Sequence, residues 1–264
     1  MRQDFWLFLG YLLGMGTMDE REEDSHRSLE LAVSLNKPMK VSVGGESREC
    51  SLLALGPGVS HRIDGNGGWQ FFGYLHPESR LGRLIMDKIN ASGRSWLYIG
   101  ADGVERKEFI SGLEEPSAYR VRELWEYLLS RLLGIKSYSL GWSSELKKML
   151  VAMESLPFSE LHAKSISEKL GVSTFELEET FSRIAGIPLT HFLFNRKLAH
   201  ASDKIKKGWS LDEAINEAGL SGTSSVTEYI RTMYGLDMER LLTEKPFIRF
   251  FSVADYEQLS GHAL

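Results

Sequence analysis

The chain has 264 residues, enough for one large domain or two of ordinary size. Hydrophobic residues make up 42% and aromatic residues 11%, as expected for a folded protein with a substantial core. The single cysteine excludes internal disulfides and cysteine-based metal clusters, and it favours a reducing, cytoplasmic location. The formal net charge of −5 excludes a uniformly basic polypeptide, so any nucleic-acid interface must be a local surface.

The first residues of the chain are apolar. The stretch from Phe5 to Met18 is too short to span a bilayer as a helix. It also lacks the basic leader and the small-residue cleavage site of a secretory signal peptide. We interpret it as one or two buried strands, followed by a charged surface loop at residues 19–24, and we expect no membrane partner.

Short segments of alternating apolar and polar residues dominate the region up to residue 75. This alternation predicts half-buried strands, which we place at residues 28–33, 39–43, 48–55, 59–63 and 69–75. Turns rich in Gly, Pro or Asn separate them, at residues 44–47, 56–58 and 64–68. Many short strands with such turns are typical of a β-sandwich or a β-barrel.

Helical spacing replaces the alternation beyond residue 78. We predict helices at residues 79–91, 116–134 and 143–154, with a mixed segment at residues 94–111 and a linker at residues 137–142. The second of these helices is strongly amphipathic. Its apolar face carries Val121, Leu124, Trp125, Leu128, Leu129 and Leu132.

The stretch from Ile166 to Leu242 contains two copies of one short sequence repeat. Gly171 and Gly186 in the first copy correspond to Gly219 and Gly235 in the second. Each copy has the pattern of a helix, a tight turn at its first glycine, and a second helix. Two helices joined by a short turn that contains glycine are typical of a helix-turn-helix motif.

Polar residues support helix starts in both copies. Ser173 with Glu176, and Ser210 with Glu213, have the spacing of a capping box. Between the copies, residues 189–207 have helical spacing and would span roughly 28 Å at 1.5 Å per residue. That length is close to the ~34 Å between successive major-groove faces on one side of a DNA duplex.

These C-terminal residues resemble the DNA-binding domain of the AraC/XylS family of bacterial transcriptional regulators. The residues that carry the resemblance are Leu170-Gly171-Val172-Ser173, Leu177, Phe181, Gly186-Ile187-Pro188, Phe192-Leu193, Arg196-Lys197-Leu198, Gly219-Leu220 and Gly235. The resemblance implies two helix-turn-helix motifs joined by a long helix. Each motif would place its second helix in a major groove.

The N-terminal region is similar to the small cupin-like sensor domains that precede such DNA-binding domains, through residues 55–61 and 72–82. The implied fold class is α+β, with a cupin-like β-barrel or sandwich followed by an all-α domain. The implied regions are a sensor domain at residues 1–92, a helical dimerisation or linker region at 93–138, a DNA-binding domain at 139–245 and a tail at 246–264.

For the sensor domain, we expect His26, His61 and Trp69 to contact a small-molecule effector. Histidines and a glutamate hold a metal in many cupins, but Ser28 stands here where a second histidine ligand is usual. Because a stable transition-metal site needs three or four protein ligands, we predict no metal and no cofactor. The sequence also lacks a phosphate-binding loop and a nucleophile elbow, so we do not expect an enzyme.

The resemblance implies DNA contacts from the second helix of each motif and from the long helix. The candidate residues are Thr174, Phe175, Glu178, Arg183, Arg196, Thr223, Ser224, Thr227 and Arg231. Glu179 and Glu228 stand where the family usually has a basic residue. A carboxylate repels phosphate, although it can accept a hydrogen bond from cytosine; the alternative is a solvated helix face. Residues 139–264 hold 14 basic and 17 acidic residues, so the region expected to bind DNA is acidic as a whole.

Lysines near the end of the long helix also have two interpretations. Lys204, Lys206 and Lys207 are candidate phosphate contacts, or they simply offset the helix macrodipole. We predict a transcriptional regulator that binds DNA, senses a small molecule and forms a homodimer. The alternative is a protein of the same fold that has lost DNA readout and modulates a partner protein through the helix at residues 116–134.

Overall fold

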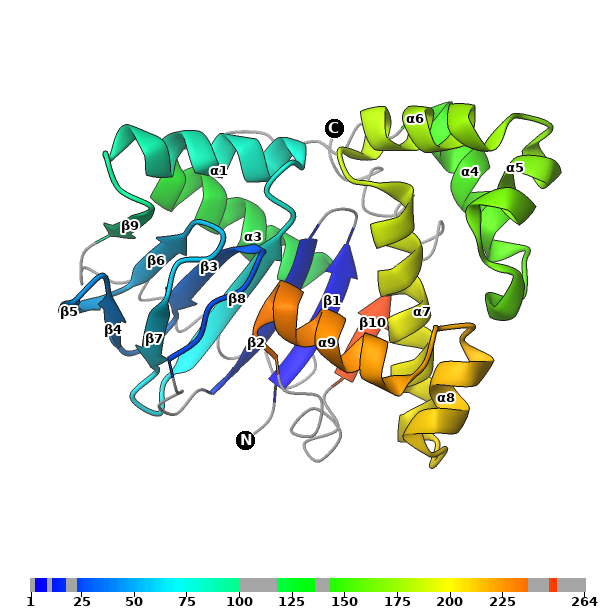
Figure 1. Cartoon of the computed structure of the whole chain (residues 1–264). Helices are drawn as coiled ribbons and strands as arrows, with labels where there is room; N and C mark the ends of the chain where they lie inside the picture. Colours follow the sequence, from blue (N-terminus) through cyan, green and yellow to red (C-terminus); the bar gives the residue numbers. More distant parts are fainter. Residues whose placement is uncertain are drawn as a thin grey trace. The chain divides into compact units, whose positions relative to one another are not determined.

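The computed structural model describes residues 3–8, 11–17, 23–99, 118–135, 143–236 and 247–250. The chain divides into two compact units, and each is described by itself, with the labels of Figure 1. Unit 1 comprises residues 1–5, 11–138 and 230–247, and unit 2 comprises residues 6–10, 139–229 and 248–264. The expected linker at residues 137–142, and most of the expected loop at 19–24 and of the tail, lie outside the described residues.

The described strands form two sheets. A seven-stranded sheet has the order β10-β1-β2-β8-β3-β6-β9, and a three-stranded sheet has the order β5-β4-β7. The pairs β2–β8, β3–β8, β3–β6, β4–β5, β4–β7 and β6–β9 are antiparallel. The strands are β1 Gln3–Phe8, β2 Tyr11–Thr17, β3 Leu29–Ser34, β4 Met39–Val43, β5 Glu46–Cys50, β6 Leu52–Leu55, β7 His61–Asp64, β8 Trp69–Leu75, β9 Trp96–Ile99 and β10 Phe247–Phe250.

The core of unit 1 is built mainly from buried apolar residues of both sheets. β4 alternates as predicted, with Met39, Val41 and Val43 buried and Lys40 exposed. β3 differs, because all of its residues are buried. β8 and β6 flank its two edges in the large sheet, and the burial of every residue shows that both of its faces are covered as well. A polar side chain on β3 must therefore find its partners inside the protein.

The single strand predicted at residues 48–55 is wrong in one respect. The structure has two strands there, β5 and β6, and they belong to different sheets. The first is largely exposed, whereas the second is buried throughout. The chain passes from one sheet to the other at Ser51, whose carbonyl accepts a hydrogen bond from the Ser34 amide at 2.8 Å.

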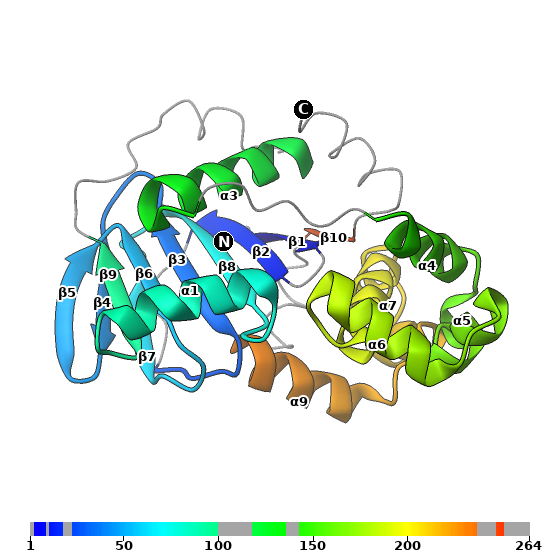
Figure 2. The ribbon, with the colours of Figure 1, turned by 90° about the horizontal axis from the view of Figure 1, so that it is seen from above.

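Two helices accompany the sheets of unit 1, α1 Arg80–Ala91 and α3 Ala118–Leu133. The Ser79 hydroxyl begins α1 by accepting a hydrogen bond from the Gly82 amide at 2.9 Å. α3 lies on the large sheet, on the side away from the viewer in Figure 1, and Figure 2 shows the same arrangement from above. A Cβ added at Gly73 of β8 would lie 2.5 Å from the Trp125 ring, so this glycine makes room for α3.

Unit 2 is built from helices. They are α4 Ser144–Glu154, the short 3₁₀ helix η1 Phe158–Glu160, α5 Ala163–Leu170, α6 Thr174–Ala185, α7 Leu189–Lys206, α8 Leu211–Glu217 and α9 Thr223–Tyr234, whose last residues belong to unit 1. The predicted fold class, antiparallel β-structure followed by a helical region, is confirmed. Among the residues that the structure describes, no helix combines the length and apolarity needed to cross a membrane.

Candidate functional site

The first repeat forms a compact pair of helices, α5 and α6. Gly171 ends α5 in the left-handed conformation, with φ of 69°, as a residue without a side chain readily does. Two residues later the Ser173 hydroxyl accepts a hydrogen bond from the Glu176 amide at 3.1 Å and begins α6. Leu177 and Phe181 of α6 are buried. The turn between the helices is thus fixed locally, and the outer face of α6 stays open.

The second repeat has its side-chain cap at the start of its first helix, α8, whereas Ser173 caps the second helix of the first repeat without forming a complete capping box. Ser210 and Glu213 form a complete capping box at the start of α8, which confirms that prediction. Gly219 has φ of 66°, and a Cβ there would lie 3.0 Å from Ser159 Cα. The Gly219 carbonyl accepts a hydrogen bond from Lys197 Nζ at 2.8 Å. This turn is therefore constrained by its neighbours as well as by its backbone conformation.

Helix α7 connects the two pairs within unit 2. Near its start, the Phe192 ring packs on Phe181 of α6, with centroids 5.1 Å apart. Further along, the Phe194 ring lies 3.9 Å from the ring of Tyr229 of α9. His200 Nε2 lies 2.5 Å from a carboxylate oxygen of Glu217 on α8. Figure 1 shows α6 at one end of α7 and α8 at the other. The 18 residues of α7 span about 27 Å.

The candidate DNA-contacting residues of α6 lie mostly on its open face. Phe175 is 76% exposed, which is unusual for so large an apolar side chain. Thr174 and Arg183 are exposed, and Glu178 is half-buried. Glu179 is exposed as well, so the open face of α6 carries both acidic and basic side chains.

On α9, Ser224, Arg231 and Glu228 are exposed, whereas Thr223 and Thr227 are half-buried. The Thr223 hydroxyl donates to the Asp212 carboxylate of α8 and so ties the start of α9 to its partner helix. The first half of α6 thus presents Thr174 beside the exposed Phe175, and the first half of α9 presents Ser224 beside the half-buried Thr223 and Thr227.

Arg196 does not lie on this surface. Its side chain is only 10% exposed, and its guanidinium lies 3.8 Å from the Glu154 carboxylate of α4. An ion pair covered to this degree is part of the packing between helices. We therefore leave Arg196 out of the proposed interface.

A second candidate site is buried in unit 1. Nε2 of His26 and Nε2 of His61 lie 2.9 Å and 3.1 Å from the same carboxylate oxygen, Oε2 of Glu30. All three residues are buried, with 5%, 6% and 1% of their surfaces exposed. The Tyr74 ring packs edge-on against His26, with centroids 5.5 Å apart. Two of the three residues expected to contact an effector thus meet around a carboxylate.

The charges in this cluster stabilise one another. Burial acts to raise the pKa of Glu30, but the hydrogen bonds and charges of the two histidines hold that pKa well below its usual range. Burial likewise acts to lower the pKa of His61, but the hydrogen bond and the charge of Glu30 outweigh it and raise that pKa. Glu30 is the central member of the cluster.

Trp69 is not part of this cluster. It begins β8, whereas Tyr74, beside His26, lies five residues further along the same strand. At ~3.4 Å per residue, the separation along the strand is roughly 17 Å. Sequence reasoning missed Glu30 because Leu29–Ser34 alternates like a half-buried strand, in which a glutamate would face water.

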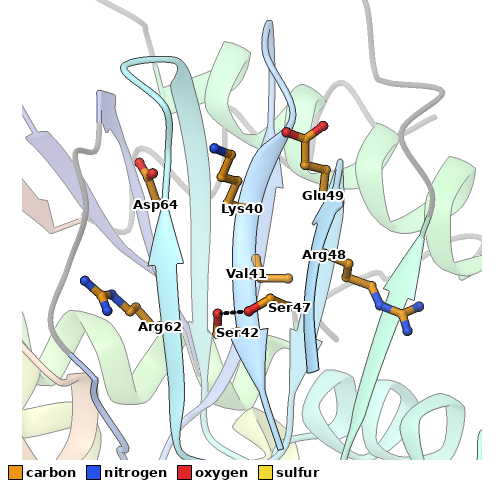
Figure 3. A pocket seen from close by; sticks show the side chains of 8 residues that line it. All are labelled: Lys40, Val41, Ser42, Ser47, Arg48, Glu49, Arg62 and Asp64. Carbon is orange, nitrogen blue, oxygen red and sulfur yellow. Dashed lines mark hydrogen bonds between the residues drawn. The ribbon is translucent and has the colours of Figure 1, made fainter. Parts of the chain in front are cut away.

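An open pocket of about 350 Å³ lies on the outer face of the three-stranded sheet (Figure 3). Its lining residues are Lys40, Val41, Ser42, Ser47, Arg48, Glu49, Arg62 and Asp64. The Ser42 and Ser47 hydroxyls share a hydrogen bond of 2.5 Å across the paired strands. Basic and acidic side chains mix here, and the pocket contains none of the predicted site residues.

No protein-family model and no curated protein matches the sequence. Among solved structures, the chain is similar to ToxT from Vibrio cholerae, with 8% identity and a TM-score of 0.45, covering 89% of this chain and 98% of that one. ToxT from strain O395 bound to (E)-4-(8-methylnaphthalen-1-yl)but-3-enoic acid has 9% identity and a TM-score of 0.45, over 89% and 99%. An RmlC-like cupin from Shewanella frigidimarina has 16% identity and a TM-score of 0.25, over 26% and 69%.

Proposed function

We propose that this protein is a DNA-binding transcriptional regulator whose helical unit contacts successive major grooves. The observation that carries the proposal is the repeated helix pair in unit 2. α5–α6 and α8–α9 have the same glycine turn, with φ of 69° at Gly171 and 66° at Gly219. They flank one helix, α7, about 27 Å long. Each pair leaves the start of its second helix accessible.

The start of α6 suits recognition of a groove. Backbone N–H groups at the start of a helix carry a partial positive charge that favours phosphate. Thr174 offers a hydroxyl there, and the exposed Phe175 offers an apolar surface for a thymine methyl group. Arg183, more than two turns further along, supplies a cation for the DNA backbone. Ser224 and Thr227 are the matching polar residues on α9.

The β-sheet unit would serve as the sensor. A ligand that binds one state of unit 1 better than another shifts the population toward that state. If this changes the affinity for DNA by some factor, DNA must change the affinity for the ligand by the same factor. The buried cluster of His26, Glu30 and His61 offers polar groups of the kind that fix a small ligand inside an apolar domain.

A DNA-binding assay with matched variants tests the proposal. The full chain should shift fragments from the region upstream of its own gene at low salt. Arg183→Ala should weaken binding and reduce the slope of log affinity against log salt by about one unit, as loss of one phosphate contact requires. Lys88→Ala removes one exposed cation from unit 1 and is the control. Equal salt slopes for the two variants, or no specific binding to any fragment, would overturn the proposal.

A second function is favoured by the acidic residues on the same surface. Glu179 and Glu228 are exposed at equivalent places of the two repeats. Carboxylates there would repel phosphate, and a protein of this shape that no longer reads DNA would act on a partner protein instead. The double variant Glu179→Arg and Glu228→Arg separates the two functions. If these positions face DNA, it should steepen the salt dependence by about two units; an unchanged slope favours the partner-binding function.

A further inference from the structure

The last turn of α9 is bound to a segment of chain that lies just before β3. An α-helix leaves its last four backbone carbonyls without a partner in a following turn. In α9 the Arg231 carbonyl accepts a hydrogen bond from the Gly235 amide at 2.9 Å, as in a continuing helix. The next two carbonyls, those of Thr232 and Met233, accept hydrogen bonds from residues outside the helix.

Arg27 and Ser28 donate these hydrogen bonds. The Arg27 amide donates to the Thr232 carbonyl at 2.8 Å, and the Ser28 amide donates to the Met233 carbonyl at 3.1 Å. The Ser28 hydroxyl donates to the same Met233 carbonyl. All four residues belong to unit 1. Two consecutive residues therefore act as a C-terminal cap of α9, although they lie about 200 positions away in the sequence.

The capped turn is closely packed. Gly235 follows α9 in the left-handed conformation, with φ of 62°, and a Cβ there would clash with the Asp24 carboxylate. The Tyr234 side chain is 3% exposed, and its ring centroid lies 5.9 Å from that of Tyr74 on β8. Ser28 is only 1% exposed. Water therefore cannot easily replace the hydrogen bonds of the cap, and their loss would leave buried carbonyls without a partner.

The buried polar cluster fixes the capping segment from its other side. A backbone carbonyl can only accept a hydrogen bond, so His26 Nδ1 donates to the Ser28 carbonyl, at 3.1 Å. The other ring nitrogen of His26 lies 2.9 Å from the Glu30 carboxylate. The His26 carbonyl accepts a hydrogen bond from the Gly58 amide at 2.8 Å. These contacts hold the two donors of the cap in place before they meet the helix.

The capped turn carries one of the candidate DNA contacts. Arg231 is exposed, and it directly precedes the two capped carbonyls. Helix ends fray where their last hydrogen bonds are weak. An arginine in a frayed turn has no fixed position from which to contact a phosphate. The cap therefore determines how well Arg231 is placed.

We propose that Arg27 and Ser28 are positioning residues of the second helix-turn-helix motif. They hold the last turn of α9 formed, and with it Arg231 in place to contact the DNA backbone. The capping role follows from the hydrogen bonds alone, whereas the positioning role rests on the proposed DNA-binding function. Their effect on DNA acts through Arg231.

Amide hydrogen exchange of the full chain tests the cap. Ser28→Ala removes the hydroxyl and keeps both backbone hydrogen bonds, so the variant should still fold. The amides of residues 231–235 should exchange about 2- to 10-fold faster, as the loss of one hydrogen bond predicts. Ser92→Ala is the matched control, because the Ser92 hydroxyl donates to the Ile89 carbonyl at the end of α1, at 2.6 Å. It should leave exchange in α9 unchanged, and an equally unchanged rate in Ser28→Ala would overturn the cap.

Specific DNA binding by a double-mutant cycle tests the positioning role. Ser28→Ala should weaken binding by at least about twofold, in proportion to the fraction of chains in which the turn is formed. Arg231→Ala should reduce the salt slope by about one unit. The double variant should bind like Arg231→Ala alone, since the cap then has no arginine to position.

The outcomes separate the two parts of the proposal. If Ser28→Ala costs no affinity, or costs as much in the absence of Arg231 as in its presence, the positioning role is wrong. If the unchanged chain binds no specific DNA fragment, the proposed function fails, and the exchange rates of residues 231–235 still decide whether Ser28 caps α9.

Discussion

The two helix pairs of unit 2 share one local design but sit in different surroundings. Gly171 of the first pair has open space where a Cβ would lie, whereas a Cβ at Gly219 would meet Ser159 Cα at 3.0 Å and the Phe158 carbonyl oxygen at 3.2 Å. The first pair packs on α4, and α8 of the second packs on α7 and η1. A repeated sequence therefore encodes a turn twice, while the neighbours decide how much each turn matters to stability.

The largest expected difference in stability is between the Gly171→Ala and Gly219→Ala variants. Gly171→Ala should lower the free energy of unfolding by about 1–2 kcal/mol, the cost of a left-handed backbone for a residue with a Cβ. Gly219→Ala should lower it by about 2–5 kcal/mol, because overpacking adds about 1–3 kcal/mol. Urea unfolding of both variants measures the difference, and equal losses would show that the contacts around Gly219 relax freely.

A smaller difference is expected between the two helix caps. Ser173→Ala removes one side-chain acceptor at the start of α6 and should lower the free energy of unfolding by about 1 kcal/mol. Ser210→Ala also removes the hydrogen bond that the hydroxyl donates to Glu213, at 2.7 Å. We expect its loss to exceed that of Ser173→Ala by a few tenths of a kcal/mol. Thermal unfolding of the two variants side by side checks the order.

The smallest effect concerns pH. Hydrogen bonds from the Ser210 hydroxyl and backbone N–H lower the pKa of Glu213. A carboxylate with a lowered folded-state pKa adds stability above its unfolded value of about 4.3, and this is lost as pH falls through the folded-state value. In Ser210→Ala the pKa of Glu213 should rise toward its ordinary range. An NMR titration of the Glu213 carboxyl below pH 5 measures the shift, and an unmoved pKa would contradict the capping box.

Local patterns predicted most of the elements. The strand at residues 69–75 and the helix at 143–154 coincide with β8 and nearly with α4, because their periodicity and caps lie within the segment itself. The capping box of Ser210 and Glu213 was predictable for the same reason. Exposure of Phe175 was expected only from the family resemblance, because by its pattern alone an apolar residue near a helix start is as common in cores as on surfaces.

Features that depend on distant neighbours escaped prediction. The alternating pattern of β3 predicts that Glu30 faces water, but every residue of this strand is buried and His61 approaches Glu30 from another sheet. Arg196 has the spacing of a surface cation, but α4 brings Glu154 to it. His61 and Glu154 lie more than thirty residues from Glu30 and Arg196, so no short window of sequence contains either of these two pairs.

The close packing of α3 on the sheet, for which Gly73 makes room, has a consequence for dimerisation. Val121, Leu124, Trp125, Leu128 and Leu129 of α3 have only 1–2% of their surfaces exposed, because the helix lies against its own sheet. A homodimer joined through this apolar stripe would first have to detach the helix. We therefore expect α3 to unfold as part of a monomer. Its midpoint temperature of unfolding should not change when the protein is diluted about a hundredfold.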